Sequence, residues 1–156
     1  MNTSWSKLLP VLLCVALLAG CTSDTVPVNN INVSLLDLQL ATPGPMLTVS
    51  YYNDNMLPII ISESSHKFYL NDVYIGIAST HEAVGLPITG TVTQKISLTL
   101  DSSVPPAKVR ALLDHASPTY RFVSSMRLSN YDMKWTFKTT SQGRYDPQHA
   151  AMPSPK

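Results

Sequence analysis

Charged residues are scarce in this sequence: Asp, Glu, Lys and Arg make up 13% of its 156 residues, and the formal net charge is +1. No basic stretch suited to nucleic acid stands out, and no acidic run does either. Ser, Thr and Asn supply most of the polarity, as they often do at solvent-facing strand positions. We therefore expect no nucleic-acid partner, and the charge pattern indicates no other partner.

The sequence also lacks an apolar run long enough to cross a membrane. Its apolar stretch begins near Leu8 and spans about a dozen residues, whereas a membrane helix needs roughly 20, and Pro10 lies near its start. Lys7 precedes this stretch and small residues follow it, a pattern typical of secretory signals. We interpret residues 1–20 as a signal peptide.

The residue after the predicted cleavage site is a cysteine. The segment Leu18-Ala19-Gly20-Cys21 resembles the lipobox of bacterial lipoproteins. The resemblance implies that the Cys21 thiol takes a diacylglyceryl group, that cleavage follows Gly20, and that the new amino terminus is acylated, with palmitate as a typical chain. A thiolate suits this step because it is a strong nucleophile. Three acyl chains would anchor the protein firmly, since each buried CH₂ adds about 0.8 kcal/mol.

The residue after the cysteine is Thr22 rather than the aspartate that commonly retains lipoproteins on the inner membrane. In a double-membraned bacterium we therefore expect the protein in the cell envelope, in the inner leaflet of the outer membrane, facing the periplasm.

Cysteine is otherwise absent. Cys14 lies in the signal peptide and is lost with it, so Cys21 is the one cysteine of the predicted mature chain. No internal disulfide can form, even in an oxidising compartment. The remaining length suits one domain with a tether or tail, held together by packing and strand ladders alone.

Beyond a polar tether over residues 21–30, the dominant hydrophobic period is two, which indicates strands. The apolar positions of 31–35 and of 36–40 alternate in opposite phase, which predicts a β-bulge at Leu35-Leu36. A hairpin is predicted over residues 67–78 with a tight turn at Asn71-Asp72. Gly85-Leu86-Pro87 interrupts the pattern, and alternation resumes over 91–101.

One helix is predicted after Pro105-Pro106, because Val109, Leu112, Leu113 and Ala116 follow the helical period. Strands over 120–128 and 133–137 come next. From residue 141 to 156 the chain is polar and rich in proline, so we expect a disordered tail. The predicted domain, residues 31–140, is all-β: an antiparallel two-sheet sandwich like immunoglobulin or fibronectin-III domains, with about seven strands and one short helix.

The order of these segments resembles a known family. The parts that carry the resemblance are the strand 33–38, the turn Asn53-Asp54-Asn55, the hairpin 68–76 and the step Leu86-Pro87. Together they are similar to the type 2 late embryogenesis abundant (LEA14-like) family, also described as the water-stress and hypersensitive-response (WHy) domain, over roughly residues 30–140. The family's Asn-Pro-Asn turn lacks its proline here, although Asp also suits a turn.

The resemblance implies a seven-stranded sandwich with one helix and a role in desiccation or another stress response. Bacterial members are often small lipoproteins, which agrees with Cys21. The family offers no established catalytic residues to carry over.

The residues themselves suggest no catalytic, cofactor or metal site. The histidines are scattered without metal-ligand spacing, and neither a Gly-x-Ser-x-Gly motif nor a Gly-rich phosphate loop occurs. His66 lies on an apolar strand face, where a structural role is favoured over a functional one. His81-Glu82 in a loop makes a weak metal site at best, and Asp114-His115 is explained by the end of the helix. The remaining histidine is His149.

Aromatic and basic residues leave two alternatives open. Trp135 and Phe137 could form a binding face, although packing of a strand accounts for them better. In Tyr51-Tyr52 one side chain should face inward and the other outward. The basic residues Arg121, Lys134 and Lys138 could share an outward face that meets anionic head groups, although a solvated face is the simpler interpretation.

The sequence therefore favours a non-catalytic, membrane-anchored protein that protects membrane or protein partners under stress through weak contacts with these clients. The alternative is an envelope binding or assembly lipoprotein that holds a lipid or protein partner. A hydrolase with dispersed residues is the least favoured interpretation, and we expect no enzyme activity.

Replacing Cys21 with Ala should leave an unlipidated precursor, because alanine offers no sulfur for the diacylglyceryl group. Mass spectrometry of the membrane fraction checks this, with the wild-type chain as reference. A normal mature mass for the variant would contradict the lipobox assignment.

Overall fold

The computed structural model describes residues 30–41, 43–131 and 133–146. The predicted signal peptide, Cys21, most of the tether and His149 lie outside the described residues. The elements are β1 (Ile31–Gln39), β2 (Met46–Asn53), β3 (Ile59–Leu70), β4 (Val73–Thr80), β5 (Val84–Leu86), β6 (Thr91–Leu100), α2 (Pro106–Leu113), β7 (Thr119–Asn130) and β8 (Met133–Arg144). No helix in this part of the chain is long and apolar enough to span a membrane.

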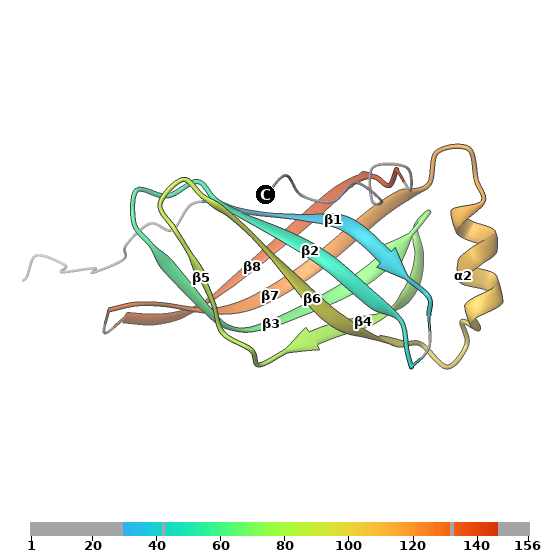
Figure 1. The fold of residues 1–156 in the computed structure, drawn as a ribbon, viewed down its shortest axis with the longest axis horizontal. Helices are drawn as coiled ribbons and strands as arrows, with labels where there is room; N and C mark the ends of the chain where they lie inside the picture. The colour runs from blue at the N-terminus through green and yellow to red at the C-terminus, as the bar shows by residue number, and fades with distance from the viewer. Residues whose placement is uncertain (1–29, 42, 132, 147–156) are drawn as a thin grey trace, which may run out of the picture.

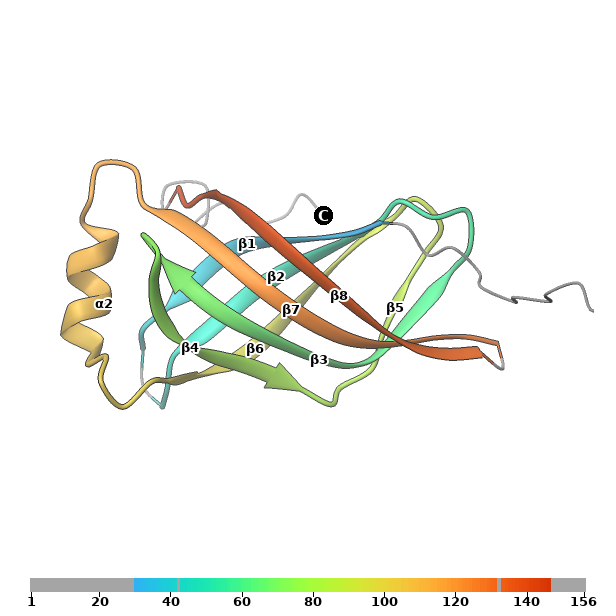
Figure 2. The same cartoon turned by 180° about the vertical axis from the view of Figure 1, so that it is seen from behind.

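The strands form one antiparallel sheet in the order β1-β2-β6-β4-β3-β7-β8, with β5 paired to β3. The sheet curls over, so that β1, β2 and β6 face β3, β7 and β8 across the interior (Figures 1 and 2). The predicted all-β antiparallel fold with one short helix is confirmed. The two predicted layers are the two halves of one continuous, curled sheet.

Strand β6 joins the two halves. Residues Thr91 to Ser97 pair with β2, and the strand then changes partner, so that Leu98 to Leu100 pair with β4. At this junction Gly76 of β4 approaches β6 so closely that an added Cβ would fall against the Thr99 carbonyl oxygen and lie 3.0 Å from the Leu100 Cα. Both atoms belong to the backbone, so no side-chain rotation could make room.

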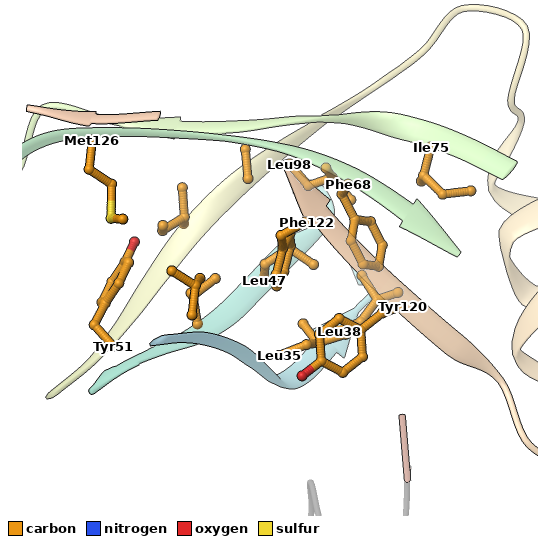
Figure 3. Close-up of a cluster of buried hydrophobic side chains, with 14 of the residues drawn as sticks. Leu35, Leu38, Leu47, Tyr51, Phe68, Ile75, Leu98, Tyr120, Phe122 and Met126 are labelled. Carbon is orange, nitrogen blue, oxygen red and sulfur yellow. The ribbon is translucent and has the colours of Figure 1, made fainter. Parts of the chain in front are cut away.

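The interior between the halves is filled by the alternating apolar faces that the sequence predicts. Phe68 of β3 and Phe122 of β7 pack with ring centroids 5.4 Å apart, and Leu47 and Leu98 approach them from the other half (Figure 3). Fully burying each such side chain contributes about 1.5–3 kcal/mol. This core is the main source of stability, because the described residues contain no cysteine.

Register shifts in the strand ladders set which side chains enter the core. The register of β1 on β2 shifts between Leu35 and Asp37, which confirms the predicted bulge. A second shift lies in β3 between Ile61 and Glu63. The buried residues of β3 have odd numbers before this shift and even numbers after it. The apolar residues 59–61 and 68–70 therefore belong to one long strand.

Two sequence predictions are wrong. The segment around Gly85-Leu86-Pro87, expected as an interruption, contains the short strand β5. The domain does not end at residue 140, because β8 pairs with β7 as far as Arg144. Residues 141–144 are polar and give no hydrophobic strand pattern. They still pair with β7, because β8 is an edge strand and the hydrogen bonds of its ladder involve only backbone groups.

The chain after β8 also closes the seam between the first and last strands. Tyr145 is 7% exposed, and its backbone N–H donates to the Pro118 carbonyl. Its hydroxyl donates to the Asp37 carboxylate and accepts from the Leu38 N–H, each at 3.3 Å. Residues 141–146 therefore belong to the fold, whereas the rest of the predicted tail lies outside the described residues.

The predicted helix is present as α2, at the end of the molecule where β3 turns into β4 (Figure 1). Val109 is its buried residue. The turn residues Asn71 and Asp72 have positive φ, as a tight hairpin turn requires. The Asn71 side chain donates to the Leu112 carbonyl and accepts from the Thr119 N–H, which fastens the hairpin to the helix and to β7.

Gly76→Ala should lower the free energy of unfolding by about 1–3 kcal/mol, the usual range for overpacking, because the methyl group presses on the β6 backbone. Gly85→Ala is the matched control, since nothing lies within 4 Å of a Cβ there. Urea denaturation of both variants measures the effect. Equal stability of the two would contradict the close approach of β4 and β6.

Candidate functional site

A chain of polar side chains crosses the core between the two halves of the sheet. The Tyr51 hydroxyl, from β2, lies 2.8 Å from His66 Nε2 and 3.2 Å from Ser64 Oγ, both from β3. His66 Nδ1 lies 2.8 Å from Ser124 Oγ of β7. Each of these groups therefore has a hydrogen-bond partner, as buried polar groups require.

Burial sets the protonation state of this chain. It lowers the pKa of His66 from 6.5 to about 4. It also raises the pKa of Tyr51 to about 12, against the smaller opposing effect of the hydrogen bond with Ser64. At neutral pH both side chains are uncharged, and one imidazole nitrogen donates while the other accepts.

The chain is positioned to connect strands rather than to meet a substrate. Tyr51 and His66 are 0% exposed, Ser64 is 1% exposed and Ser124 is 2% exposed. The structural interpretation of His66 agrees with this burial. The sequence analysis did not predict the hydrogen-bond partners of His66. Ser64 and Ser124 are hydroxyl residues on otherwise apolar inward strand faces, and this polar position within an apolar face is the signal that could have identified them.

The other predicted histidine sites do not assemble into a metal or catalytic site. His81 is exposed, with its Nδ1 3.9 Å from Glu63 Oε1. Asp114 is the C-cap of α2, and His115 follows it at the surface. Across the described ranges, no group of three or more His, Cys, Asp or Glu side chains could hold a metal ion.

The aromatic predictions concern β2 and β8. Tyr51 is buried and Tyr52 is 36% exposed, so one faces inward and the other outward, as predicted. Trp135 and Phe137 are partly buried and pack against the core. Packing therefore accounts for both aromatic residues of β8.

The predicted basic residues do share a face, the outer surface of β3, β7 and β8. We call this the basic face; its basic side chains are Lys67, Arg121, Arg127, Lys134, Lys138 and Arg144. Glu63 reduces the charge through an ion pair with Arg127 at 3.0 Å, and Asp72 lies 3.7 Å from Arg121. Arg121 also stacks on Tyr69, 3.8 Å from the ring centroid. Although the formal net charge of the chain is only +1, six of its basic side chains lie on this one face of the sheet.

Asparagine side chains organise the loops at the end opposite α2. Buried Asn53 donates to the carbonyls of Leu57 and Pro87, at 2.9 and 3.0 Å, and its carbonyl oxygen accepts from Asn55. Buried Asn130 donates to the Pro58 carbonyl at 2.7 Å. The loops 54–58 and 87–90 and the β7–β8 hairpin are thereby tied together.

Comparison with known proteins gives a limited result. No family model matches the chain, and no curated protein matches it. Among solved structures, a protein from Archaeoglobus fulgidus is 16% identical and has a TM-score of 0.41, covering 75% of this chain and 98% of its own. The protein AT1g01470 from Arabidopsis thaliana is 18% identical with a TM-score of 0.45, covering 73% of this chain and 76% of its own.

A third structure, At2g46140.1, is described as a "putative late embryogenesis abundant (LEA) protein"; it is 14% identical with a TM-score of 0.43, covering 90% of this chain and 83% of its own. Similarity at this level does not establish membership of a family.

The buried imidazole predicts a pH-dependent stability. Its pKa is about 6.5 in the unfolded chain and about 4 in the folded one, so the unfolded chain binds the proton more readily below pH 6.5. Stability is then complete above pH 6.5 and falls towards pH 4; between pH 7 and pH 5 the loss should be about 2 kcal/mol.

Urea denaturation at the two pH values checks this. His66→Gln should lose much less stability between them, whereas His81→Gln, at an exposed position, should behave like the wild type. A wild-type loss that persists in His66→Gln would show that another group titrates.

Proposed function

We propose that this chain is a bacterial envelope lipoprotein that carries a non-catalytic domain of the LEA type 2/WHy kind and protects neighbouring membrane or protein surfaces during desiccation or another stress. The observation that carries the proposal is the lipobox at Cys21, followed after a short tether by the family-like segments within an all-β domain. Cys21 would carry the acyl chains, and Thr22 supports a place in the inner leaflet of the outer membrane.

Two local features support the LEA type 2/WHy assignment. The Asn53-Asp54-Asn55 turn is organised by the buried Asn53 side chain, which explains why asparagine is needed there even without the family's proline. The hairpin over Phe68–Gly76 turns at Asn71 and Asp72, both in the left-handed region that asparagine and aspartate adopt more readily than most other non-glycine residues.

The surface chemistry gives a physical basis for protection. Four of the five outward positions of β6 carry hydroxyl groups, namely Thr91, Thr93, Ser97 and Thr99, and the fifth is Lys95. A hydroxyl both donates and accepts hydrogen bonds. Such a surface can replace part of the water lost from a neighbouring lipid head group or protein during drying.

The basic face favours a second candidate function, an envelope binding or assembly lipoprotein. Lys67 of β3 and Lys134 and Lys138 of β8 point away from the core on the two strands that flank β7, where they would suit an anionic lipid or an acidic protein surface. Native mass spectrometry of the lipoprotein isolated from cells separates the candidates, because a stable partner should co-purify in this case.

In a drying assay, the lipoprotein reconstituted in vesicles should preserve the activity of a labile enzyme better than vesicles carrying an equal mass of albumin. The variant Lys67→Gln/Lys134→Gln/Lys138→Gln should protect equally well if hydroxyl groups are responsible. Protection no better than albumin would contradict the protective role, whereas protection lost only in the lysine variant would favour the binding function.

A deletion strain tests the same proposal in cells. Survival after drying should fall, and it should be restored by the wild-type gene but not by Cys21→Ala. Full restoration by the unlipidated variant would contradict the need for the anchor.

A further inference from the structure

The two most exposed large hydrophobic side chains of the described residues lie at one end of the molecule (Figure 1). Tyr131 is 88% exposed and Met56 is 80% exposed. Together with Leu57, Ile88 and Met133, at 40%, 48% and 36%, they form a group that we call the apolar rim. Its members come from the β2–β3 loop, the β5–β6 loop and the β7–β8 hairpin, all at the end opposite α2 (Figures 1 and 2). Three separate loops thus expose apolar side chains at one and the same end of the domain (Figure 1).

The rim is held in place by internal contacts. Asn53 and Asn130 bind the three loops to one another, and the Asn53 N–H also donates to the Gly90 carbonyl at 2.9 Å. Thr89, next to Ile88, and Tyr131 both have positive φ, 47° and 48°. Positive φ is required in tight turns, although it is less favourable for threonine and tyrosine than for glycine or asparagine. The loops that expose the apolar side chains of the rim are therefore held in place by hydrogen bonds of Asn53 and Asn130.

The chain that leads to the predicted anchor joins the domain at this same end. The Asn30 carbonyl accepts from the Asp54 N–H at 3.1 Å and from the Asn55 side chain at 3.1 Å, so the start of β1 lies beside the β2–β3 loop. Residues 21–30 can span at most roughly 30 Å when fully extended. An acylated Cys21 would thus keep the apolar rim within a short distance of the bilayer.

We infer that the apolar rim inserts into the interfacial region of the membrane that holds the lipid anchor, so that the domain stands on its loop end with α2 pointing away. This inference rests on the proposed anchoring at Cys21. A phenol ring on a loop tip suits the interface, because its apolar body and polar hydroxyl match the boundary between acyl chains and head groups. The orientation leaves the hydroxyl-rich and basic outer faces of the sheet open to the periplasm.

Fluorescence quenching in reconstituted vesicles tests the orientation. Because Cys21 would be acylated, a newly introduced cysteine is the one free thiol of the mature chain and can be labelled selectively. The lipoprotein with Ile88→Cys, Lys138→Cys or Lys108→Cys would carry an environment-sensitive dye on the rim, the basic face or α2. The vesicles contain phosphatidylethanolamine, phosphatidylglycerol and a lipid bearing a nitroxide in its acyl chain.

The rim dye should shift to shorter wavelength and be quenched by the nitroxide lipid, whereas the α2 dye should show neither change. Adding Met56→Ser/Tyr131→Ser to the Ile88→Cys protein should abolish most of the quenching. The matched control is Ile77→Ser/Val123→Ser, which removes exposed apolar side chains, 36% and 37% exposed, outside the rim. Circular dichroism confirms that each variant is folded.

The remaining outcomes would each overturn the inference. If the protein floats with the vesicles but the rim dye is not quenched, the lipid anchor is supported and insertion of the apolar rim is refuted. If the protein does not float with the vesicles, both the anchor and the insertion are refuted. Quenching strongest at Lys138 would mean that the domain lies on its basic face. A blue shift at Ile88 that depends on protein density rather than on the nitroxide lipid would mean that a second copy covers the rim.

Discussion

The structure depends on one strand that belongs to both halves of the sheet. Because β6 pairs first with β2 and then with β4, the core is enclosed by a continuous hydrogen-bonded ladder rather than by two separate sheets. Within the described residues no disulfide can reinforce this arrangement. The opposite seam is closed by Tyr145, which bonds to β1 through its side chain and to Pro118 through its backbone. Side-chain size at the β4–β6 junction is therefore a direct constraint on the fold.

Buried polar groups add positional constraints to the apolar core. The hydrogen bonds of Tyr51 and His66 require β2, β3 and β7 to keep one register, because a shift of one residue would turn these side chains outward. The cost is a buried imidazole that must stay neutral. The side chains of Asn53, Asn71 and Asn130 fix the positions of the loops by donating hydrogen bonds to backbone carbonyls. The loops at the end opposite α2 are consequently organised although they expose apolar side chains.

Sequence patterns predicted the parts of this architecture that follow from local alternation. The inward faces of β6 and β7, the bulge of β1 and the Asn71-Asp72 turn were all predicted. Strand β5 and the last residues of β8 were missed because their pairing uses backbone groups and leaves little hydrophobic pattern. His66 was noticed, but its partner Tyr51 lies on another strand. The apolar rim could not be predicted, since only the topology of the sheet brings the loops that carry Met56, Ile88 and Tyr131 to the same end of the molecule (Figure 1).

Native-state hydrogen exchange measures most directly whether the curled sheet is one cooperative unit. Amide protons bonded between β2 and β6 and those bonded between β3 and β7 should exchange with the same free energy of opening and the same dependence on urea, because β6 and β4 join the halves. Exchange of the β3–β7 amides at a clearly lower free energy, while the β2–β6 amides stay protected, would show that the halves open independently and would contradict this account.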